Sequence, residues 1–264
     1  MSEVIKSLIL GIIQGLTEFL PVSSSGHLEL AKYFLGTDFV GNESLVMTVI
    51  LHIATAISTV VVFRKEIWHL IRGIFKKGWN EEKSFALKIF ISMIPAGLTG
   101  YFLEDKLETL FEGQVVFVAF MLIITGILLL LSDFVKGKEH DISYKDSFIV
   151  GIAQAFALLP GISRSGSTIA TSVLLGIKKE KAAFFSFIMV LPLIFGKMAK
   201  DLMDGVYVHS HISPAAMLAG FAGALITGIV ACKWMIVLVK NSKLRYFAYY
   251  CFAVAIIALV LVLL

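Results

Sequence analysis

Apolar residues occur along this chain in two kinds of run. Six runs are long enough to cross a bilayer, which takes about 20 residues. They lie near residues 45–63, 86–102, 115–134, 182–198, 214–239 and 247–264. The remaining apolar runs are shorter and come in two pairs, each joined by a polar loop. This pattern predicts an all-α polytopic membrane protein with about six transmembrane helices.

The shorter runs do not fit as simple spans. Ile5–Leu20 would make about 24 Å of helix, against a hydrocarbon core of about 30 Å. It is followed by a loop and a second short run, Leu28–Leu35, and the segment from Ser147 to Leu175 repeats this arrangement. Non-helical backbone at membrane depth is tolerated only where it is buried in protein or lines a wet cavity. We therefore expect two re-entrant helix pairs with their loops inside the membrane.

The two loops are copies of one segment. Residues 11–26 read GIIQGLTEFLPVSSSG and residues 151–166 read GIAQAFALLPGISRSG, an offset of 140 positions. Only the prolines slip, and Ser24 falls opposite Arg164. One re-entrant pair and about three spans in each half would insert the second copy upside down, so that the loops meet at the midplane. We predict a single membrane domain with a first repeat over 1–140 and an inverted second repeat over 141–264.

Composition and charge agree with this class. Hydrophobic residues make up 58% of the chain and charged residues 16%, against roughly 25% charged in soluble domains. The net charge of +4 is modest and gives no reason to expect nucleic-acid binding. Basic residues gather in the segment 64–83, which we expect to be a loop and which the positive-inside rule places in the cytoplasm. The first pair would then enter from the outer side and the second from the cytoplasm.

The loops have the chemistry of an anion site. In each pair the second helix begins at the loop, so its free N–H groups and positive dipole end favour phosphate. Arg164 adds forked donors that match phosphate oxygens. A cation at this depth costs on the order of 3 kcal/mol, which favours a functional role. The plainer alternative is that the loop serines and glycines only cap helices and permit close packing.

Two further ionisable residues lie beside the first loop. Glu18 follows Gln14 by four positions, so both face one side of the helix. An intramembrane carboxylate is a functional candidate, although Glu18 could merely neutralise Arg164. His27 is expected to carry protons beside Ser24 and Glu18. Gln154 and His52 are expected to be structural, and His52 to be packed.

The segments Gln14–His27 and Pro160–Thr168 together resemble the two signature motifs of bacterial undecaprenyl-diphosphate phosphatase, the bacitracin-resistance protein family. The likeness in length, spacing and span pattern covers nearly the whole chain. It implies hydrolysis of undecaprenyl diphosphate to undecaprenyl phosphate and phosphate, which recycles the cell-wall lipid carrier and confers bacitracin resistance. It also implies the bacterial cytoplasmic (inner) membrane, with an active site that opens to the periplasmic side.

The resemblance assigns roles to individual residues. It implies the nucleophile at Ser24, the phosphate clamp at Arg164 and acid–base work at Glu18 and His27. The phosphate oxygens would be held by Ser23, Ser25, Gly26, Ser163, Ser165, Gly166 and Thr168. A divalent cation, Mg²⁺ or Ca²⁺, is implied as well. Because Gln14 stands where many members have an acid, Glu18 and Gln14 would hold the ion weakly, and the diphosphate would supply most ligands.

Other interpretations stay open to different degrees. Type-2 phosphatidic acid phosphatases share fragments of these motifs, but they need a nucleophilic histidine where this chain has Ala170. A lipid-phosphate flippase or ion-coupled transporter would use the same anion site without cleaving the substrate. The choice between a phosphoserine and direct attack by water stays open, as do a homodimer, the metal's identity and prenyl chain-length preference.

We predict that Arg164→Lys severely impairs phosphate release, although the variant keeps the positive charge. Lysine lacks the planar fork that binds two phosphate oxygens at once. Phosphate release by the purified variant measures the effect. Near-normal turnover would remove the clamp role from Arg164.

Overall fold

The computed structural model describes residues 2–36, 42–110, 114–134, 140–203, 205, 212–241 and 244–263. Over these residues the chain forms helices and no strand beyond one isolated bridge. This confirms the all-α prediction. The helices are α1 (Glu3–Phe19), α2 (Ser24–Leu35), α3 (Asn42–Val62), α4 (Arg64–Ile74), α5 (Glu81–Thr109), α6 (Val115–Phe134), α7 (Tyr144–Phe156), α8 (Arg164–Leu174), α9 (Lys179–Met203), α10 (Pro214–Asn241) and α11 (Arg245–Leu263).

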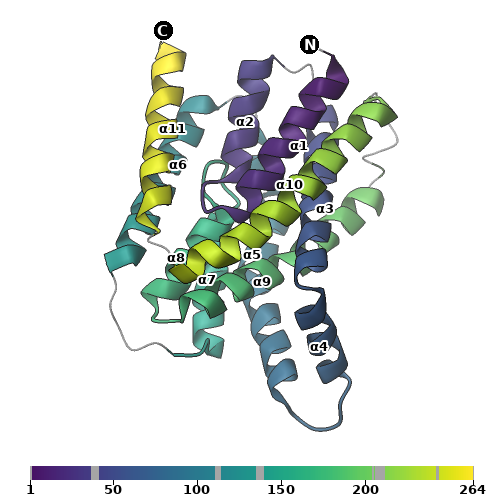
Figure 1. Cartoon of the computed structure of the whole chain (residues 1–264), viewed down its shortest axis with the longest axis vertical. Helices are drawn as coiled ribbons and strands as arrows, with labels where there is room; N and C mark the ends of the chain where they lie inside the picture. The colour runs from purple at the N-terminus through teal and green to yellow at the C-terminus, as the bar shows by residue number, and fades with distance from the viewer. Residues whose placement is uncertain are drawn as a thin grey trace.

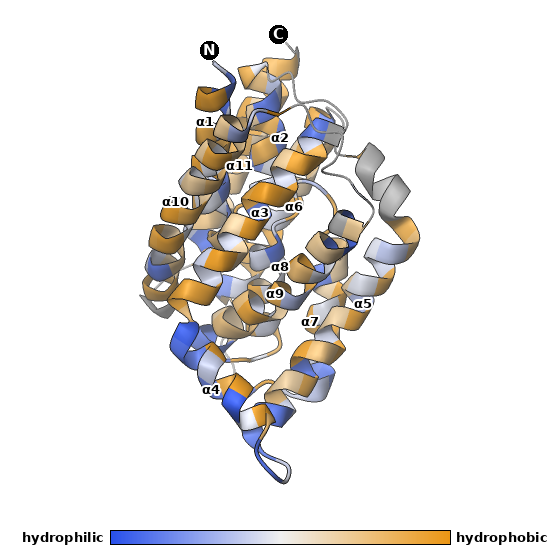
Figure 2. Cartoon of the chain, turned by 90° about the vertical axis from the view of Figure 1, so that its right-hand side faces the viewer, coloured by the Kyte–Doolittle hydropathy of each residue, from blue (hydrophilic) through white to orange (hydrophobic). Residues whose placement is uncertain are grey.

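Six helices are long and apolar enough to cross a membrane within the described ranges: α3, α5, α6, α9, α10 and α11. Each coincides with one of the six predicted runs to within a few residues, so the prediction of about six transmembrane helices is confirmed. These helices are coloured mostly hydrophobic along their length, and hydrophilic residues are dense at the end that carries α4 (Figure 2). The chain is a multi-pass membrane protein.

The segment 64–83 is more ordered than the sequence pattern indicated. We expected a loop, but its first part is α4. Ile67 and Leu70 of α4 pack against the main core, while Arg64, Lys65 and Glu66 are exposed. An amphipathic helix of this length is hard to recognise because its apolar stripe is short. It lies at the end of the molecule opposite both termini (Figure 1).

The two pairs of short helices are α1 with α2 and α7 with α8. Figure 1 shows the first pair at the end that carries the termini and the second pair towards the other end, with their loops facing the middle. The second helix of each pair begins earlier than its apolar run, because Ser23 and Ser163 accept the backbone N–H groups of Gly26 and Gly166 as N-caps. The repeat boundary at residue 140 and the inversion itself stay predictions.

Duplicated glycines let each pair approach a spanning helix closely. α1 packs along α10, and α7 packs along α5. A Cβ atom on Gly11 would come within 2.2 Å of the Gly220 carbonyl oxygen, and one on Gly151 within 2.4 Å of the Ser92 carbonyl oxygen. Any side chain at either position would force the helices apart. These contacts fix the depth of the loops, because α10 and α5 both span the membrane.

We expect Gly11→Ala to destabilise the protein by about 1–3 kcal/mol, the usual cost of overpacking. The added methyl group would meet backbone, which cannot rotate away. Gly97→Ala in α5 is the matched control, because its Cβ would meet no atom within 4 Å. Thermal unfolding in detergent compares the two. Equal stability of both variants would contradict the close approach of α1 to α10.

Candidate active site

The two loops meet inside the helix bundle. A Cβ on Gly26 would lie 3.1 Å from the Cα of Gly161, so the backbones nearly touch. Ser165 Oγ, at the start of α8, donates to the carbonyl oxygens of Glu18 and Leu20 at 3.3 and 3.2 Å. The first of these contacts reaches a carbonyl at the end of α1, and the Leu20 carbonyl also accepts the Val22 backbone N–H at 2.8 Å. The second loop therefore helps to cap the C-terminal end of α1.

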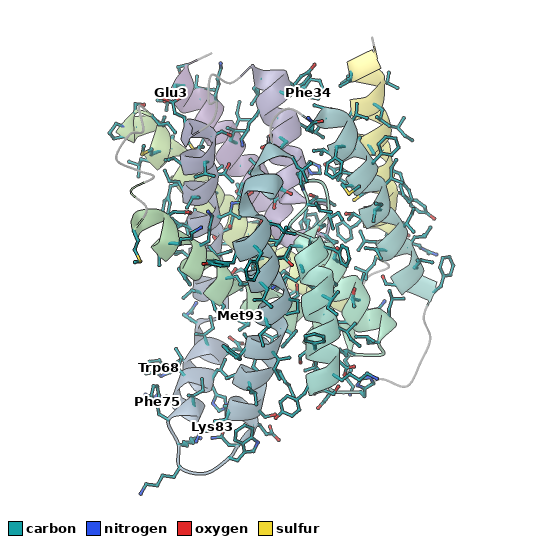
Figure 3. The ribbon with its side chains drawn as sticks, turned by 180° about the vertical axis from the view of Figure 1, so that it is seen from behind. Glu3, Phe34, Trp68, Phe75, Lys83 and Met93 are labelled. Carbon is teal, nitrogen blue, oxygen red and sulfur yellow. The ribbon has the colours of Figure 1, made fainter. Side chains whose placement is uncertain are left out.

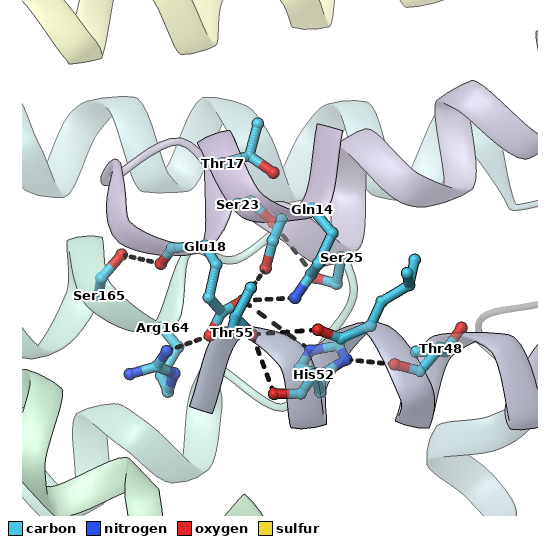
Figure 4. A network of polar contacts seen from close by, with 12 residues as sticks. Gln14, Thr17, Glu18, Ser23, Ser25, Thr48, His52, Thr55, Arg164 and Ser165 are labelled. Carbon is cyan, nitrogen blue, oxygen red and sulfur yellow. Dashed lines mark hydrogen bonds and ion pairs between the residues drawn. The ribbon is translucent and has the colours of Figure 1, made fainter. Parts of the chain in front are cut away.

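Glu18 is the centre of the polar network (Figure 4). Its side chain is 6% exposed, and its carboxylate pairs with the guanidinium of Arg164. Ser24 Oγ donates to Oε2 of Glu18 at 2.5 Å, and Gln14 Nε2 donates to the same oxygen at 3.1 Å. Hydrogen bonds to an ionised acceptor are the stronger class. The structure therefore brings together the predicted nucleophile, acid, clamp and amide.

His27 does not join this group. Its Nδ1 lies 2.7 Å from the Ser23 carbonyl oxygen, which can only accept, so Nδ1 must carry the proton. In the neutral ring Nε2 is then an acceptor, and it receives the Tyr250 hydroxyl at 3.0 Å. The two rings also stack, with centroids 5.6 Å apart. The expected contact of His27 with Ser24 and Glu18 is therefore wrong. The ring is instead held between the Ser23 carbonyl oxygen and Tyr250 of α11.

His52 was expected to be packed, but it faces the site. Its Nε2 lies 3.9 Å from Oε2 of Glu18, and its Nδ1 donates to the Thr48 carbonyl oxygen at 2.8 Å. It comes from α3, a predominantly apolar span. A histidine in such a span is an intramembrane ionisable residue, and this signal alone could have identified it.

The residues expected to hold phosphate divide into two groups. Ser23 and Ser163 cap α2 and α8. Ser165 is engaged with α1 carbonyls, and Thr168 bonds the Arg164 carbonyl oxygen at 2.8 Å and the Ser186 hydroxyl at 2.6 Å. These side chains hold the loops in place. Ser24, Ser25 and Arg164 are partly exposed, whereas Gly26 and Gly166 are buried at the two helix starts.

The sequence as a whole was compared with known proteins. A family model described as bacitracin resistance protein BacA matches residues 7–257. The chain belongs to this family. A protein of Christiangramia forsetii is 56% identical over 98% of both chains, and one of Bacteroides fragilis is 46% identical over 98% of both. A Methanococcus vannielii protein is 43% identical over 94% of this chain and 96% of its own. All three are named undecaprenyl-diphosphatase.

The two loops of this BacA-family protein turn at different positions in the left-handed region of backbone conformation. Each contains one residue with positive φ: Gly161 at +96° in the second loop and Ser23 at +69° in the first. When the loop serines are aligned, Pro21 stands where the second loop has Gly161, and proline cannot adopt positive φ. The left-handed turn is made instead at Ser23, next to Ser24. A serine in this region is strained, and such strain is common at functional sites.

The donor set beside Glu18 fits a hard divalent cation. Oε1 of Gln14 is buried and has no hydrogen-bond partner within the described residues. Amide and carboxylate oxygens are the ligands that Mg²⁺ and Ca²⁺ prefer. No cluster of three or more His, Cys, Asp or Glu side chains able to hold a metal occurs in the described parts of the chain. Gln14 and Glu18 would therefore need further ligands from a bound molecule.

Gln154 holds the position equivalent to Gln14 in the second copy. It is 2% exposed, and neither of its amide atoms has a partner among the residues described. Leu158 replaces the acid that would follow it. Both copies of the segment therefore carry the glutamine, but only the first copy carries the glutamate.

We expect Ser23→Gly to stabilise the fold by about 1 kcal/mol. Relief of a strained φ is worth about 1–3 kcal/mol, whereas exchanging a serine N-cap for glycine costs only a few tenths. Ser163→Gly is the matched control, because Ser163 caps α8 with an ordinary φ of −72°. Its loss of the cap brings no relief and should lower stability. Thermal unfolding of both variants in detergent checks the opposite signs, and a fall in both would refute strain at Ser23.

Proposed function

We propose that this chain is an integral-membrane phosphatase that hydrolyses undecaprenyl diphosphate to undecaprenyl phosphate and phosphate. One observation carries the proposal: a serine hydroxyl at a helix N-terminus is hydrogen-bonded to a carboxylate that also pairs with an arginine. Full-length relatives with the name undecaprenyl-diphosphatase support it. The lipid bilayer and the isoprenoid diphosphate are then its two molecular partners.

Ser24 is the proposed nucleophile. Its oxygen attacks the terminal phosphorus of the diphosphate, and its proton passes along the existing 2.5 Å hydrogen bond to Glu18. The bond from phosphorus to the bridging oxygen breaks, and undecaprenyl phosphate leaves. Water then releases phosphate from the serine. The N–H groups at the start of α2 face the transferred phosphoryl group during both steps.

Arg164 is the proposed phosphate clamp, but its guanidinium is now shared with Glu18. A terminal phosphate carries more negative charge than a carboxylate and offers three oxygens to the fork. Binding of substrate would therefore draw Arg164 from Glu18. This exchange would leave Glu18 free to accept the Ser24 proton when a phosphate is in place.

Transport alone would not use every feature of this site. A flippase needs a cation and helix starts to hold the phosphate, and Arg164 with α2 and α8 would serve that purpose. It has no use for a hydroxyl hydrogen-bonded to a buried carboxylate. The contact of Ser24 with Glu18 therefore favours hydrolysis.

A divalent cation is part of the proposal. Glu18 and the unpartnered amide oxygen of Gln14 would hold it together with oxygens of the diphosphate. When bound, Mg²⁺ or Ca²⁺ would neutralise charge on the diphosphate. Gln14 also orients Glu18 through its amide N–H.

We place the protein in the cytoplasmic membrane of a bacterium with the site open to the periplasm. The support is the charge distribution, since Arg64, Lys65, Arg72, Lys76, Lys77 and Lys83 all lie in or near α4, at the end remote from the termini (Figure 1). The positive-inside rule makes this end cytoplasmic. The α1–α2 pair then enters from the outer side.

Glu18→Gln should lower turnover by on the order of 100-fold or more, the usual cost of losing one group that interacts with the transition state. Gln14→Glu should keep or raise turnover at saturating Mg²⁺, because an acid is a better cation ligand than an amide. Phosphate release by both variants over a Mg²⁺ titration decides the matter. Equal, mild effects would leave Glu18 as only a counter-ion for Arg164.

Ser24→Ala separates the covalent path from direct attack by water. Loss of a nucleophile should reduce turnover by several orders of magnitude. Loss of a binding group alone would cost about 1–3 kcal/mol, or about ten- to a hundred-and-fifty-fold. Phosphate release from undecaprenyl diphosphate by the purified variant is the measurement. A variant that keeps a tenth of wild-type turnover would rule out Ser24 as nucleophile and leave hydrolysis to Arg164, Glu18 and water.

A further inference from the structure

An apolar groove of about 380 Å³ lies between α1, α2 and α11. Its walls include Ile13 and Leu16 from α1, Leu30 and Phe34 from α2, and Val254 and Ile257 from α11. The groove is open at one side, and several wall residues are well exposed, with Phe34 at 49% and Ile257 at 57%. α11 packs chiefly on α6, so its face towards α1 and α2 is left uncovered.

One end of the groove is polar and adjoins the active site. Thr17, His27 and Tyr250 line it there. Thr17 directly precedes Glu18, and His27 is bonded to the backbone of Ser23 in the first loop. A molecule that filled the groove would therefore reach the His27 ring, which itself contacts the first loop at Ser23.

Helical spacing separates the two functions of α1. Ile13 and Thr17, four residues apart, face the groove, while Gln14 and Glu18, also four apart, face the polar network. α2 divides in the same way, since its N-terminal Ser24 faces Glu18 and Leu30 and Phe34 face the groove further along. The same two helices thus contribute to the anion site and to the apolar groove beside it.

We propose that this groove binds the first isoprene units of the lipid diphosphate. The inference rests on the proposed function, because it assigns the tail of that substrate. The volume is near the lower end of small-molecule sites, about 300–1,000 Å³, so it holds only a few isoprene units. The rest of the chain lies in the bilayer. Phe34 marks the far end of the groove, at the end of the molecule opposite Lys83 (Figure 3).

Two substitutions change the groove without touching the polar network. Ala31→Phe adds a ring to a partly buried groove position, and Phe34→Ala removes one. Ala253→Phe is the matched control, because Ala253 is exposed on α11 and does not line the groove. The readout is kcat/KM for the C15 farnesyl diphosphate relative to that for the C5 dimethylallyl diphosphate.

We expect Ala31→Phe to lower this ratio by about tenfold or more through KM, because several methylene groups lose their apolar contact. Phe34→Ala should lower it less, and Ala253→Phe should leave it unchanged. An unchanged ratio in Ala31→Phe, with wild-type activity on both substrates, would overturn the groove assignment while the phosphatase proposal stands. No phosphate release by the wild type from undecaprenyl diphosphate itself would refute the phosphatase proposal.

A binding measurement tests the groove independently of turnover. A farnesyl diphosphate analogue with a photoreactive group on its first isoprene unit should label α11 between Val254 and Ala258. Labelling should persist in excess phosphatidylglycerol and weaken in Ala31→Phe. Competition by phosphatidylglycerol would show a site for bulk lipid, and labelling confined to other helices would place the tail elsewhere. Either result would overturn the proposal.

Discussion

The ion pair between Glu18 and Arg164 is the interaction on which the rest of this structure depends. Each charge lies at membrane depth and would be costly alone, so each requires the other. The pair joins the end of α1 to the start of α8, residues that are far apart in the sequence. Both loops must therefore reach the same depth, and the close contacts of α1 with α10 and α7 with α5 hold them there. The Ser165 hydroxyl reinforces the junction by closing the end of α1.

Much of this arrangement could be predicted from the sequence because bilayer physics is strict. The length of an apolar run separates spans from short helices, and a cation within the membrane must have a partner, for which Glu18 was one interpretation. Side-chain direction could not be predicted in the same way. His27 lies three residues after Ser24, yet its ring turns towards Tyr250, a contact between residues remote in the sequence. His52 lies at the site because α3 packs beside α1. This is a tertiary contact, and the local sequence pattern does not predict it.

The two copies of the loop have diverged through backbone constraints as much as through side chains. The first loop has a proline at the position of Gly161, and its left-handed residue is Ser23 instead, directly before the proposed nucleophile Ser24. The second copy keeps the relaxed turn and provides the cation. The first copy therefore combines the strained Ser23, the Ser24 hydroxyl and the Glu18 carboxylate. The second copy supplies the Arg164 cation and the Ser165 hydroxyl that bonds the end of α1. Neither copy makes a site by itself, which explains how a duplicated segment can yield one asymmetric centre.

The pairing of Arg164 with Glu18 also has a consequence after the chemistry is complete. If Arg164 clamps phosphate as proposed, a carboxylate tethered within hydrogen-bond reach would take the place of the phosphate when it leaves. Free phosphate from solution would then have to displace an internal competitor whose effective concentration is far above its own. The ion pair would in this way limit product inhibition. The lipid diphosphate would overcome the same competitor because its apolar tail, already dissolved in the membrane, adds binding energy that free phosphate lacks.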